Sequence, residues 1–222
     1  IVQRVSTSFG LIVTDPGTQL ISYYTKPTAG CSVLVTNGAT LSGGDWYGGG
    51  DLIVTGPGSR GQFGTYIYAA TSVRITDSGR IDSTGEFMCP NVVIGGGSGV
   101  STGQVSTSYI GEGYNPYQWK ITTNGVLDIM GGYLEVRDGW FGAAMASILT
   151  LDTGTVAMRT NSTLRLKENA VYGNNDGFGG VLRGTGTIRR RTASGDNFSI
   201  LSEGLIRPGD VSATPAIGTL TV

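Results

Sequence analysis

The chain has 222 residues, a formal net charge of −1, 14% charged residues and no histidine. A charge this close to zero predicts no attraction to nucleic acid or to an anionic membrane surface. Hydrophobic residues make up 39% of the chain, which excludes intrinsic disorder, and no stretch reaches the ~18 apolar residues of a membrane span. The 38 glycines follow no three-residue period, so the chain is not a collagen.

Short apolar strands alternate with polar corners along most of the chain. Residues 33–41 (VLVTNGATL) show the pattern, in which an alternating strand is followed by an Asn-Gly corner and a second alternating strand. Alternation with period two is typical of β-strands, and β-branched residues favour them. The same pattern recurs at residues 52–58, 73–81, 91–100, 119–129, 148–158 and 163–172.

The corners recur at a nearly constant interval. Gly38, Gly58, Gly79 and Gly99 each follow the previous one by about 20 residues. Asn and Gly turn the chain sharply because they adopt the left-handed backbone conformation at low cost. The interval predicts a right-handed parallel β-helix (β-solenoid) of about ten coils, forming a single domain over residues 1–222. An antiparallel sandwich is the alternative, because Asn-Gly also marks hairpins.

Strand alternation assigns a buried side to each coil, and polar segments interrupt the coils. The segment 101–118 is polar, aromatic and glycine-rich and predicts a long loop insertion; 45–50 and 172–180 predict shorter ones. The basic run at 189–191 predicts a loop or corner. The residues expected to face inward are Val33, Val35, Ile75, Ile121, Leu149 and Leu151.

The C-terminal third resembles a known family. Residues 180–188 (GVLRGTGTI) and 204–222 (GLIRPGDVSATPAIGTLTV) are similar to the autotransporter-associated β-strand repeat. This resemblance implies a right-handed β-helix exported to the bacterial surface, as in autotransporter passenger domains. The stretch 210–216 is longer than the usual link of the repeat, which leaves the geometry of that corner open. The family shares no catalytic residues, so the resemblance transfers none.

Two cysteines, Cys31 and Cys89, permit one disulfide. The predicted coils place them two to three coils apart, whereas a disulfide requires Cα atoms within about 7 Å. A bridge would therefore need a loop that folds back along the axis, and the sequence leaves the question open.

The residue inventory argues against catalysis. Without histidine, a Ser-His-Asp or Cys-His arrangement cannot be assembled, and most transition-metal sites lack their usual ligand. The 16 acidic residues are scattered along the chain. We expect no enzyme activity, no metal and no cofactor. A carbohydrate-active β-helix enzyme, the alternative, would need a groove with two carboxylates within about 10 Å of each other.

Aromatic residues in the predicted insertions are the candidate contact residues. Aromatic side chains on loops stack on sugar rings or anchor protein partners. Covering the flanks of the coils is the alternative role. The candidates for contact with a glycan or protein partner are Trp46, Tyr47, Tyr109, Tyr114, Tyr117, Trp119 and Trp140.

These features favour a non-catalytic extracellular or cell-surface protein, structural or adhesive, with a carbohydrate-binding module as a further alternative. Residues 1–13 and 217–222 are strand-like and carry no polar cap. Solenoid ends need covering for solubility. We therefore expect either a piece of a longer solenoid or head-to-tail self-association into a filament.

Overall fold

The computed structural model is all-β, with no helix among the residues it describes. Consequently, none of those residues belongs to a helix long and apolar enough to cross a membrane. The described residues are 5–7, 10–68, 71–83, 86–89, 91–96, 99–110, 118–136, 148–158, 162–166, 181–185, 187–190, 198–202 and 205–208.

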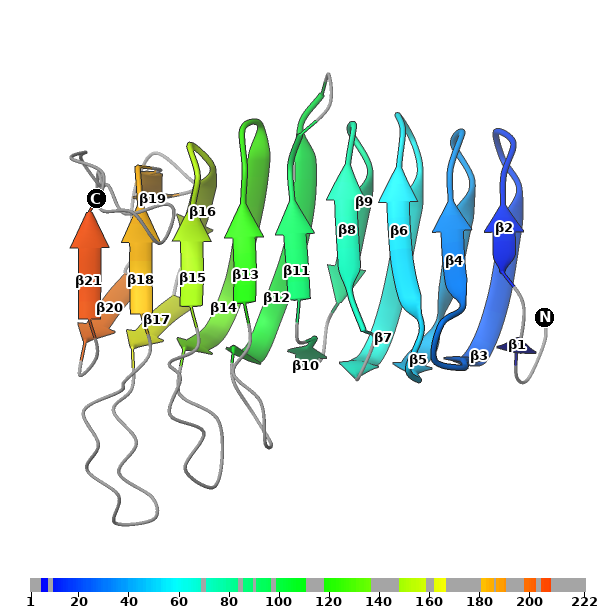
Figure 1. Cartoon of the computed structure of the whole chain (residues 1–222), viewed down its shortest axis with the longest axis horizontal. Coiled ribbons are helices and arrows are strands. Elements are labelled where there is room, and N and C mark those ends of the chain that lie inside the picture. The colour runs from blue at the N-terminus through cyan, green and yellow to red at the C-terminus, as the bar shows by residue number, and fades with distance from the viewer. Residues whose placement is uncertain are drawn as a thin grey trace, which may run out of the picture.

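Two parallel sheets run side by side along the length of the molecule (Figure 1). Sheet B has nine strands in the order β2-β4-β6-β8-β11-β13-β15-β18-β21. Its strands are β2 (Leu11–Val13), β4 (Ser32–Val35), β6 (Asp51–Thr55), β8 (Val73–Thr76), β11 (Asn91–Ile94), β13 (Gln118–Ile121), β15 (Ile148–Leu151), β18 (Val181–Gly184) and β21 (Leu205–Pro208).

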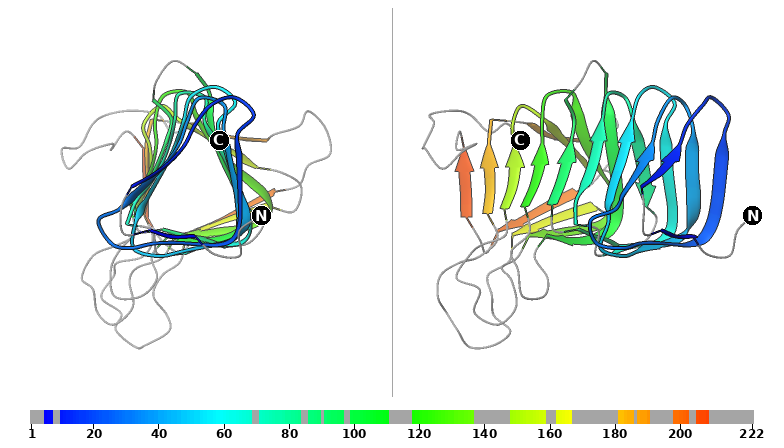
Figure 2. Two further views of the ribbon diagram at one scale, coloured as in Figure 1. Left: turned by 90° about the vertical axis from the view of Figure 1, so that its right-hand side faces the viewer. Right: turned by 45° about the vertical axis from the view of Figure 1, so that its right-hand side comes forward.

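Sheet A has twelve strands, several of them long and bent. Seen along the stack, its strands and those of sheet B outline a triangle (Figure 2, left). Its strands are β1 (Val5–Thr7), β3 (Gln19–Pro27), β5 (Thr40–Tyr47), β7 (Arg60–Tyr68), β9 (Arg80–Ser83), β10 (Glu86–Met88), β12 (Ser101–Ile110), β14 (Gly125–Val136), β16 (Thr155–Met158), β17 (Ser162–Leu166), β19 (Thr187–Arg190) and β20 (Phe198–Ser202).

Every strand pairing among the described residues is parallel, so the antiparallel alternative is wrong. Side chains that bond across neighbouring strands come from residues 20 to 22 apart in the first turns and 30 to 33 apart further on. The lengthening follows from extra residues between strands, as the sequence predicts. Sheet B has nine strands among the described residues, one for each coil, whereas the sequence predicts about ten coils.

A single apolar core lies between the two sheets. One face of each short strand supplies it, because alternate residues of a strand point to opposite sides. The pattern in β4, β6, β11 and β13 is the same, with the second and fourth residues buried. All six residues predicted to face inward have no exposed surface, which confirms them: Val33, Val35, Ile75, Ile121, Leu149 and Leu151.

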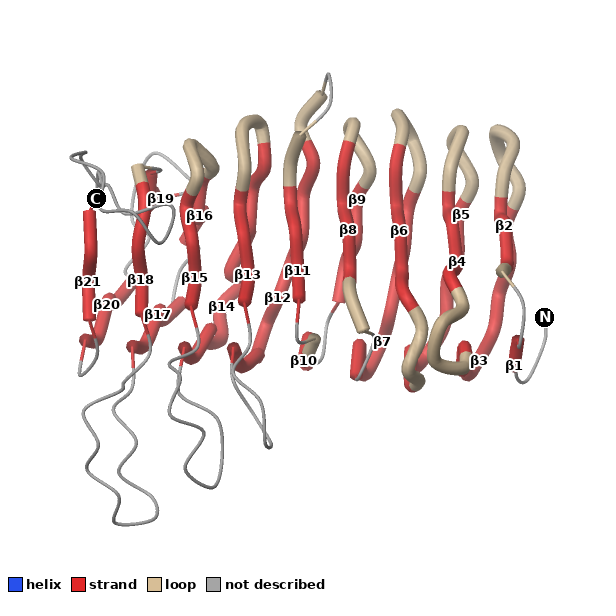
Figure 3. Tube along the Cα trace, in the orientation of Figure 1, coloured by secondary structure: helices blue, strands red, loops and turns tan. Residues whose placement is uncertain are grey.

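The corners that follow the sheet B strands lie at one vertex of the triangular cross-section, above the strands in Figure 3. Left-handed backbone recurs there in successive turns, with φ between 48° and 77°. This conformation reverses the chain within two or three residues. The residues that carry it include Asn37, Gly58, Asp77, Asn124 and Thr153.

Only some of the predicted corner glycines are there for their backbone freedom. Gly38 and Gly58 have φ of 78° and 77°. At the later corner Asn124 takes the left-handed conformation, and Gly125 does not. A Cβ on Gly125 would lie 2.2 Å from the carbonyl oxygen of Ile94. Glycine is needed there because two backbones approach closely.

The predicted loop at 101–118 is wrong over its first part. Residues 101–110 form β12, which pairs with β9 and β14. Its Ser and Thr content suggested a loop, yet alternation is present, since Ser101, Gly103 and Val105 are buried. A Cβ on Gly103 would lie 2.5 Å from Cδ1 of Ile94, so glycine here makes room for a core side chain. Residues 111–117 lie outside the described part of the chain.

Two further predicted irregularities are strands over part of their length. Residues 45–47 complete β5 rather than starting an insertion. Arg189 and Arg190 belong to β19, where they pair with Ala157 and Met158. The basic run is therefore not a loop over these two residues, while 191 and the predicted insertion at 172–180 lie outside the described residues.

Cys31 and Cys89 are both buried, and neither forms a disulfide. Cys31 immediately precedes β4 and Cys89 lies between β10 and β11, with β6 and β8 in between. Three strand spacings of about 4.8 Å separate them by roughly 14 Å, well beyond disulfide reach. The separation of the two cysteines predicted from the sequence, two to three coils, therefore agrees with the absence of a disulfide between them.

Candidate functional site

Trp46 lies in the core and not on a surface loop. It has no exposed surface, and its ring meets the edge of Phe63 at a centroid separation of 6.1 Å. The register of β5 against β7 shifts between Gly43 and Asp45. The register advances by two residues on β5 and by three on β7, so the extra residue lies on β7. Alternation on β5 breaks at the same place, since Leu41 and Trp46 are five residues apart and both are buried. The prediction of Trp46 as a contact residue is wrong for this reason.

Trp119 is likewise buried, at 1% exposure, so its prediction as a contact residue is also wrong. Its indole Nε1 donates a hydrogen bond to the carbonyl oxygen of Cys89 at 2.9 Å, and its ring lies 5.1 Å from that of Phe87. Alternation with Ile121, two residues later in β13, was the available signal for burial.

Tyr47 is exposed, and it lies close to side chains that are distant from it in the sequence. Its ring centroid lies 6.1 Å from that of Tyr24, and Nζ of Lys26 lies 5.7 Å from the Tyr47 ring. Tyr66 pairs in register with Asp45, one strand along. Tyr47 and Tyr66 are 40% and 42% exposed. We call Tyr24, Lys26, Tyr47 and Tyr66 the tyrosine patch.

The patch occupies β3, β5 and β7 on one side of sheet A. Tyr109 lies in β12 of the same sheet, in register with Glu135 of β14. Three other predicted contact residues, Tyr114, Tyr117 and Trp140, lie outside the described residues. Tyr24 and Tyr66 were missed because they stand within strands, where only the turn-to-turn register shows that they neighbour Tyr47.

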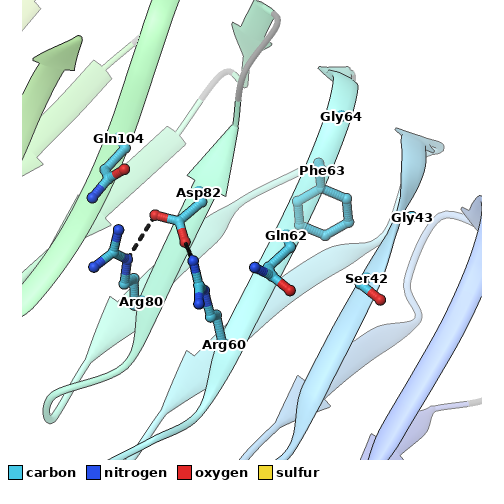
Figure 4. Close-up of a pocket in the computed structure, with 9 residues that line it drawn as sticks. All are labelled: Ser42, Gly43, Arg60, Gln62, Phe63, Gly64, Arg80, Asp82 and Gln104. Atoms are coloured by element: carbon cyan, nitrogen blue, oxygen red, sulfur yellow. Dashed lines mark hydrogen bonds and ion pairs between the residues drawn. The ribbon is translucent and has the colours of Figure 1, made fainter.

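A pocket of about 490 Å³ lies on the outer side of sheet A, over positions of β5 and β7 that precede those of the tyrosine patch. Its centre is Asp82 on β9, which two arginines hold (Figure 4). Nε and Nη2 of Arg60 lie 2.7 and 2.5 Å from Oδ2 of Asp82. Nε of Arg80 lies 2.6 Å from Oδ1. Arg60 and Arg80 are register partners on β7 and β9, so Asp82 separates two like charges that would otherwise repel.

Neutral hydrogen-bonding side chains continue the pocket on both sides. Ser42, Gln62, Asp82 and Gln104 occupy one register row across β5, β7, β9 and β12. With its amide oriented to accept, Gln62 receives hydrogen bonds of 3.1 Å from Nε and Nη2 of Arg60. Gln104 is 3% exposed, and its amide Nε2 has no hydrogen-bond partner among the described residues.

Glycines leave the pocket open at the bend of sheet A. Gly43 and Gly64 line it and project no side chain. A Cβ on Gly43 would overlap the carbonyl oxygen of Ser22, since the ideal position lies 1.9 Å from that atom. The close approach of two backbones therefore fixes glycine at this position.

The charged groups of the pocket are mainly hydrogen-bond donors, the guanidinium groups of Arg60 and Arg80. It contains one carboxylate, and both oxygens of that carboxylate are engaged by guanidinium groups. Acid-base hydrolysis of a glycosidic bond uses two carboxyl groups, and only one lines this pocket. Within the described ranges no three Asp, Glu, Cys or His residues gather to hold a metal ion.

Comparisons with known proteins identify no relative. No family model, curated protein or solved structure matches this chain.

Proposed function

We propose that the chain is a right-handed parallel β-solenoid that serves as a non-catalytic structural or adhesive protein outside the cell. Support for the architecture comes from the parallel pairing of each strand with the strand one turn later. In Figure 2 (left), sheet B lies on the left and runs upward, so the chain turns clockwise as it recedes from its N-terminal end. That sense corresponds to a right-handed coil.

The observation that carries the adhesive role is the tyrosine patch. Isolated exposed apolar side chains are normal on a protein surface, whereas a cluster points to an interaction site. Here two tyrosines near 40% exposure stand beside Tyr24 and a lysine on the flat face of three paired strands. Tyrosine offers a large contact area with little loss of side-chain entropy on binding.

Export to a bacterial surface is part of the proposal. It is supported by the scarcity of charge and the resemblance of residues 180–188 and 204–222 to a repeat of surface proteins. A carbohydrate-active enzyme is less well supported, because the described pocket offers one carboxylate where such chemistry uses two.

One binding experiment tests the adhesive role. The purified chain is applied to immobilised glycans and extracellular-matrix proteins, in parallel with the double variant Tyr47→Ala/Tyr66→Ala and the control Tyr23→Ala. Tyr23 is the more exposed tyrosine, at 72%, and lies beside Gly44, outside the patch. We expect a bound partner that the double variant loses by about tenfold or more while the control keeps it. Binding that survives the double variant, or polysaccharide turnover by the chain, contradicts the proposal.

Head-to-tail self-association belongs to the same proposal. The strands β2 and β21 form the two ends of the described sheet B, and Ile12 on β2 is 64% exposed. Parallel pairing of β21 with β2 of a second copy would continue both the sheet and the core. Light scattering of the chain at rising concentration should show growing particles, and a constant monomer mass would contradict this part.

A further inference from the structure

We propose that the pocket between β5 and β12 binds the carboxylate of an acidic sugar, a uronic acid unit of a polysaccharide. The inference rests on the proposed surface-binding function, but it concerns a different group of side chains from the tyrosine patch. The volume of the pocket, about 490 Å³, falls in the range of small-ligand pockets, about 300–1,000 Å³.

The charge of the pocket favours an anion. Two guanidinium groups face one carboxylate, which leaves an excess of one positive charge. Asp82 is 13% exposed, whereas the side chains of Arg60 and Arg80 are 42% and 44% exposed. A ligand from solvent therefore meets the arginines, while the carboxylate that opposes them lies beneath.

Arg80 has the geometry for a carboxylate. Its Nε is the atom that bonds Asp82, and its two terminal nitrogens have no partner among the described residues. These nitrogens remain available in the planar arrangement that carboxylates accept in pairs of hydrogen bonds. Asp82 fixes the guanidinium in place, so little side-chain entropy is lost when a ligand binds.

Gln104 supplies a second, independent indication. A buried amide nitrogen without a partner is destabilising, and native proteins contain few of them. Gln104 lies beside Asp82 in register, and Arg80 precedes Asp82 by two residues on the same strand, so Gln104 and Arg80 are diagonal neighbours. An acceptor oxygen held between them would satisfy Nε2 of Gln104 and the Arg80 fork together.

The position of the pocket favours a sugar over an acidic peptide. The strands β5, β7, β9 and β12 are each paired on both sides, so an extended peptide cannot add to them as a further strand. Recognition is left to side chains, and the row of Ser42, Gln62 and Gln104 provides the donors and acceptors that hydroxyl groups require.

Calorimetric titration with an oligogalacturonate tests the inference on the full chain. The probe is compared with its methyl ester, which keeps the ring and hydroxyls but lacks the charge, and with an oligoglutamate peptide. The variants are Arg80→Gln and, as control, Arg74→Gln. Arg74 is an exposed arginine on β8 of sheet B, so both variants remove one positive charge, and only Arg80 belongs to the pocket.

We expect the oligogalacturonate to bind at least about tenfold more tightly than its methyl ester, and Arg80→Gln to abolish this difference while Arg74→Gln preserves it. A far-UV circular dichroism spectrum equal to that of the parent confirms that Arg80→Gln folds. Should Arg80→Gln not fold, Arg60→Gln replaces it, with the same expectation.

Three results would overturn the inference: no binding of the oligogalacturonate, equal or tighter binding of the oligoglutamate, or an equal loss in Arg74→Gln. The last would show nonspecific attraction, and the second a peptide site. None of them bears on the tyrosine patch, whose variants leave the pocket unchanged, so failure here is distinguishable from failure of the proposed function.

Discussion

The two buried tryptophans provide a matched test of the core. Trp46 and Trp119 have 0% and 1% exposure, and each packs against a phenylalanine ring. Their indole nitrogens differ, because Nε1 of Trp119 bonds the Cys89 carbonyl and Nε1 of Trp46 has no partner among the described residues. Replacing each with phenylalanine removes about the same apolar area, so the difference between the two variants isolates the polar contribution.

The size of that difference follows from hydrogen-bond energetics. Trp119→Phe removes a buried hydrogen bond with a net value of about 1 kcal/mol and leaves a buried carbonyl with one bond fewer. Trp46→Phe removes a buried donor whose desolvation costs about 1–3 kcal/mol in the parent protein. The two effects have opposite signs, so we expect Trp119→Phe to be less stable than Trp46→Phe by about 2 kcal/mol or more.

Urea denaturation followed by far-UV circular dichroism measures this difference as a shift in midpoint at constant slope. A change in slope would indicate that a variant has altered the unfolded or native state, and its midpoint would then be set aside in favour of thermal unfolding. Equal destabilisation by the two substitutions, or a greater loss in Trp46→Phe, would refute the assignment of the two indole environments.

Three other outcomes are expected. Gly43→Ala should destabilise the chain by more than about 3 kcal/mol, because the added Cβ overlaps the backbone of Ser22. The control Gly64→Ala, whose added Cβ has its nearest neighbour at 3.7 Å, should change the urea midpoint little. Similar effects of the two substitutions would contradict the close approach of the Gly43 and Ser22 backbones. Asp82→Asn should lower the free energy of unfolding by about 1 kcal/mol at low ionic strength, because the charges of Arg60 and Arg80 then repel each other without a carboxylate between them. In about 1 M salt the loss should be smaller, because salt screens this repulsion. A loss independent of salt would contradict this explanation. Cys31 and Cys89 should react with a thiol reagent only after denaturation, and both should then react without prior reduction. Rapid labelling of the native chain would contradict their burial, and a need for reductant would contradict the absence of a disulfide.

Local patterns in the sequence were sufficient for the regular part of the fold. Val33, Val35 and Ile75 could be assigned to the core because strand alternation depends only on neighbouring residues. The same rule does not extend to Trp46, because alternation on β5 breaks beside the bulge in its pairing with β7, and Leu41 and Trp46, five residues apart, are both buried. The run of two glycines at 43 and 44 was the one local sign of that bulge.

The pocket could not be found by local pattern, because its members come from four different strands. Arg60, Arg80, Asp82 and Gln104 become neighbours only through the register between turns. Their positions relative to the corner glycines do carry a signal, since Arg60 follows Gly58 and Arg80 follows Gly79 by one or two residues. Aligning the repeats corner by corner, rather than searching the chain for clusters, would have placed the two arginines side by side.

The regular faces of the stack, rather than its insertions, hold both candidate sites described here. In a parallel stack each turn adds one residue to each outward row, so four neighbouring strands bring four of the pocket's side chains into one row: Ser42, Gln62, Asp82 and Gln104. The core residues beneath occupy the intervening positions, and substitutions in an outward row leave them in place. Such a scaffold can change what it binds without changing how it folds. For this chain it follows that exposed strand residues such as Arg80 and Tyr66 are better first targets for mutagenesis than the predicted loop aromatics, two of which, Trp46 and Trp119, support the core.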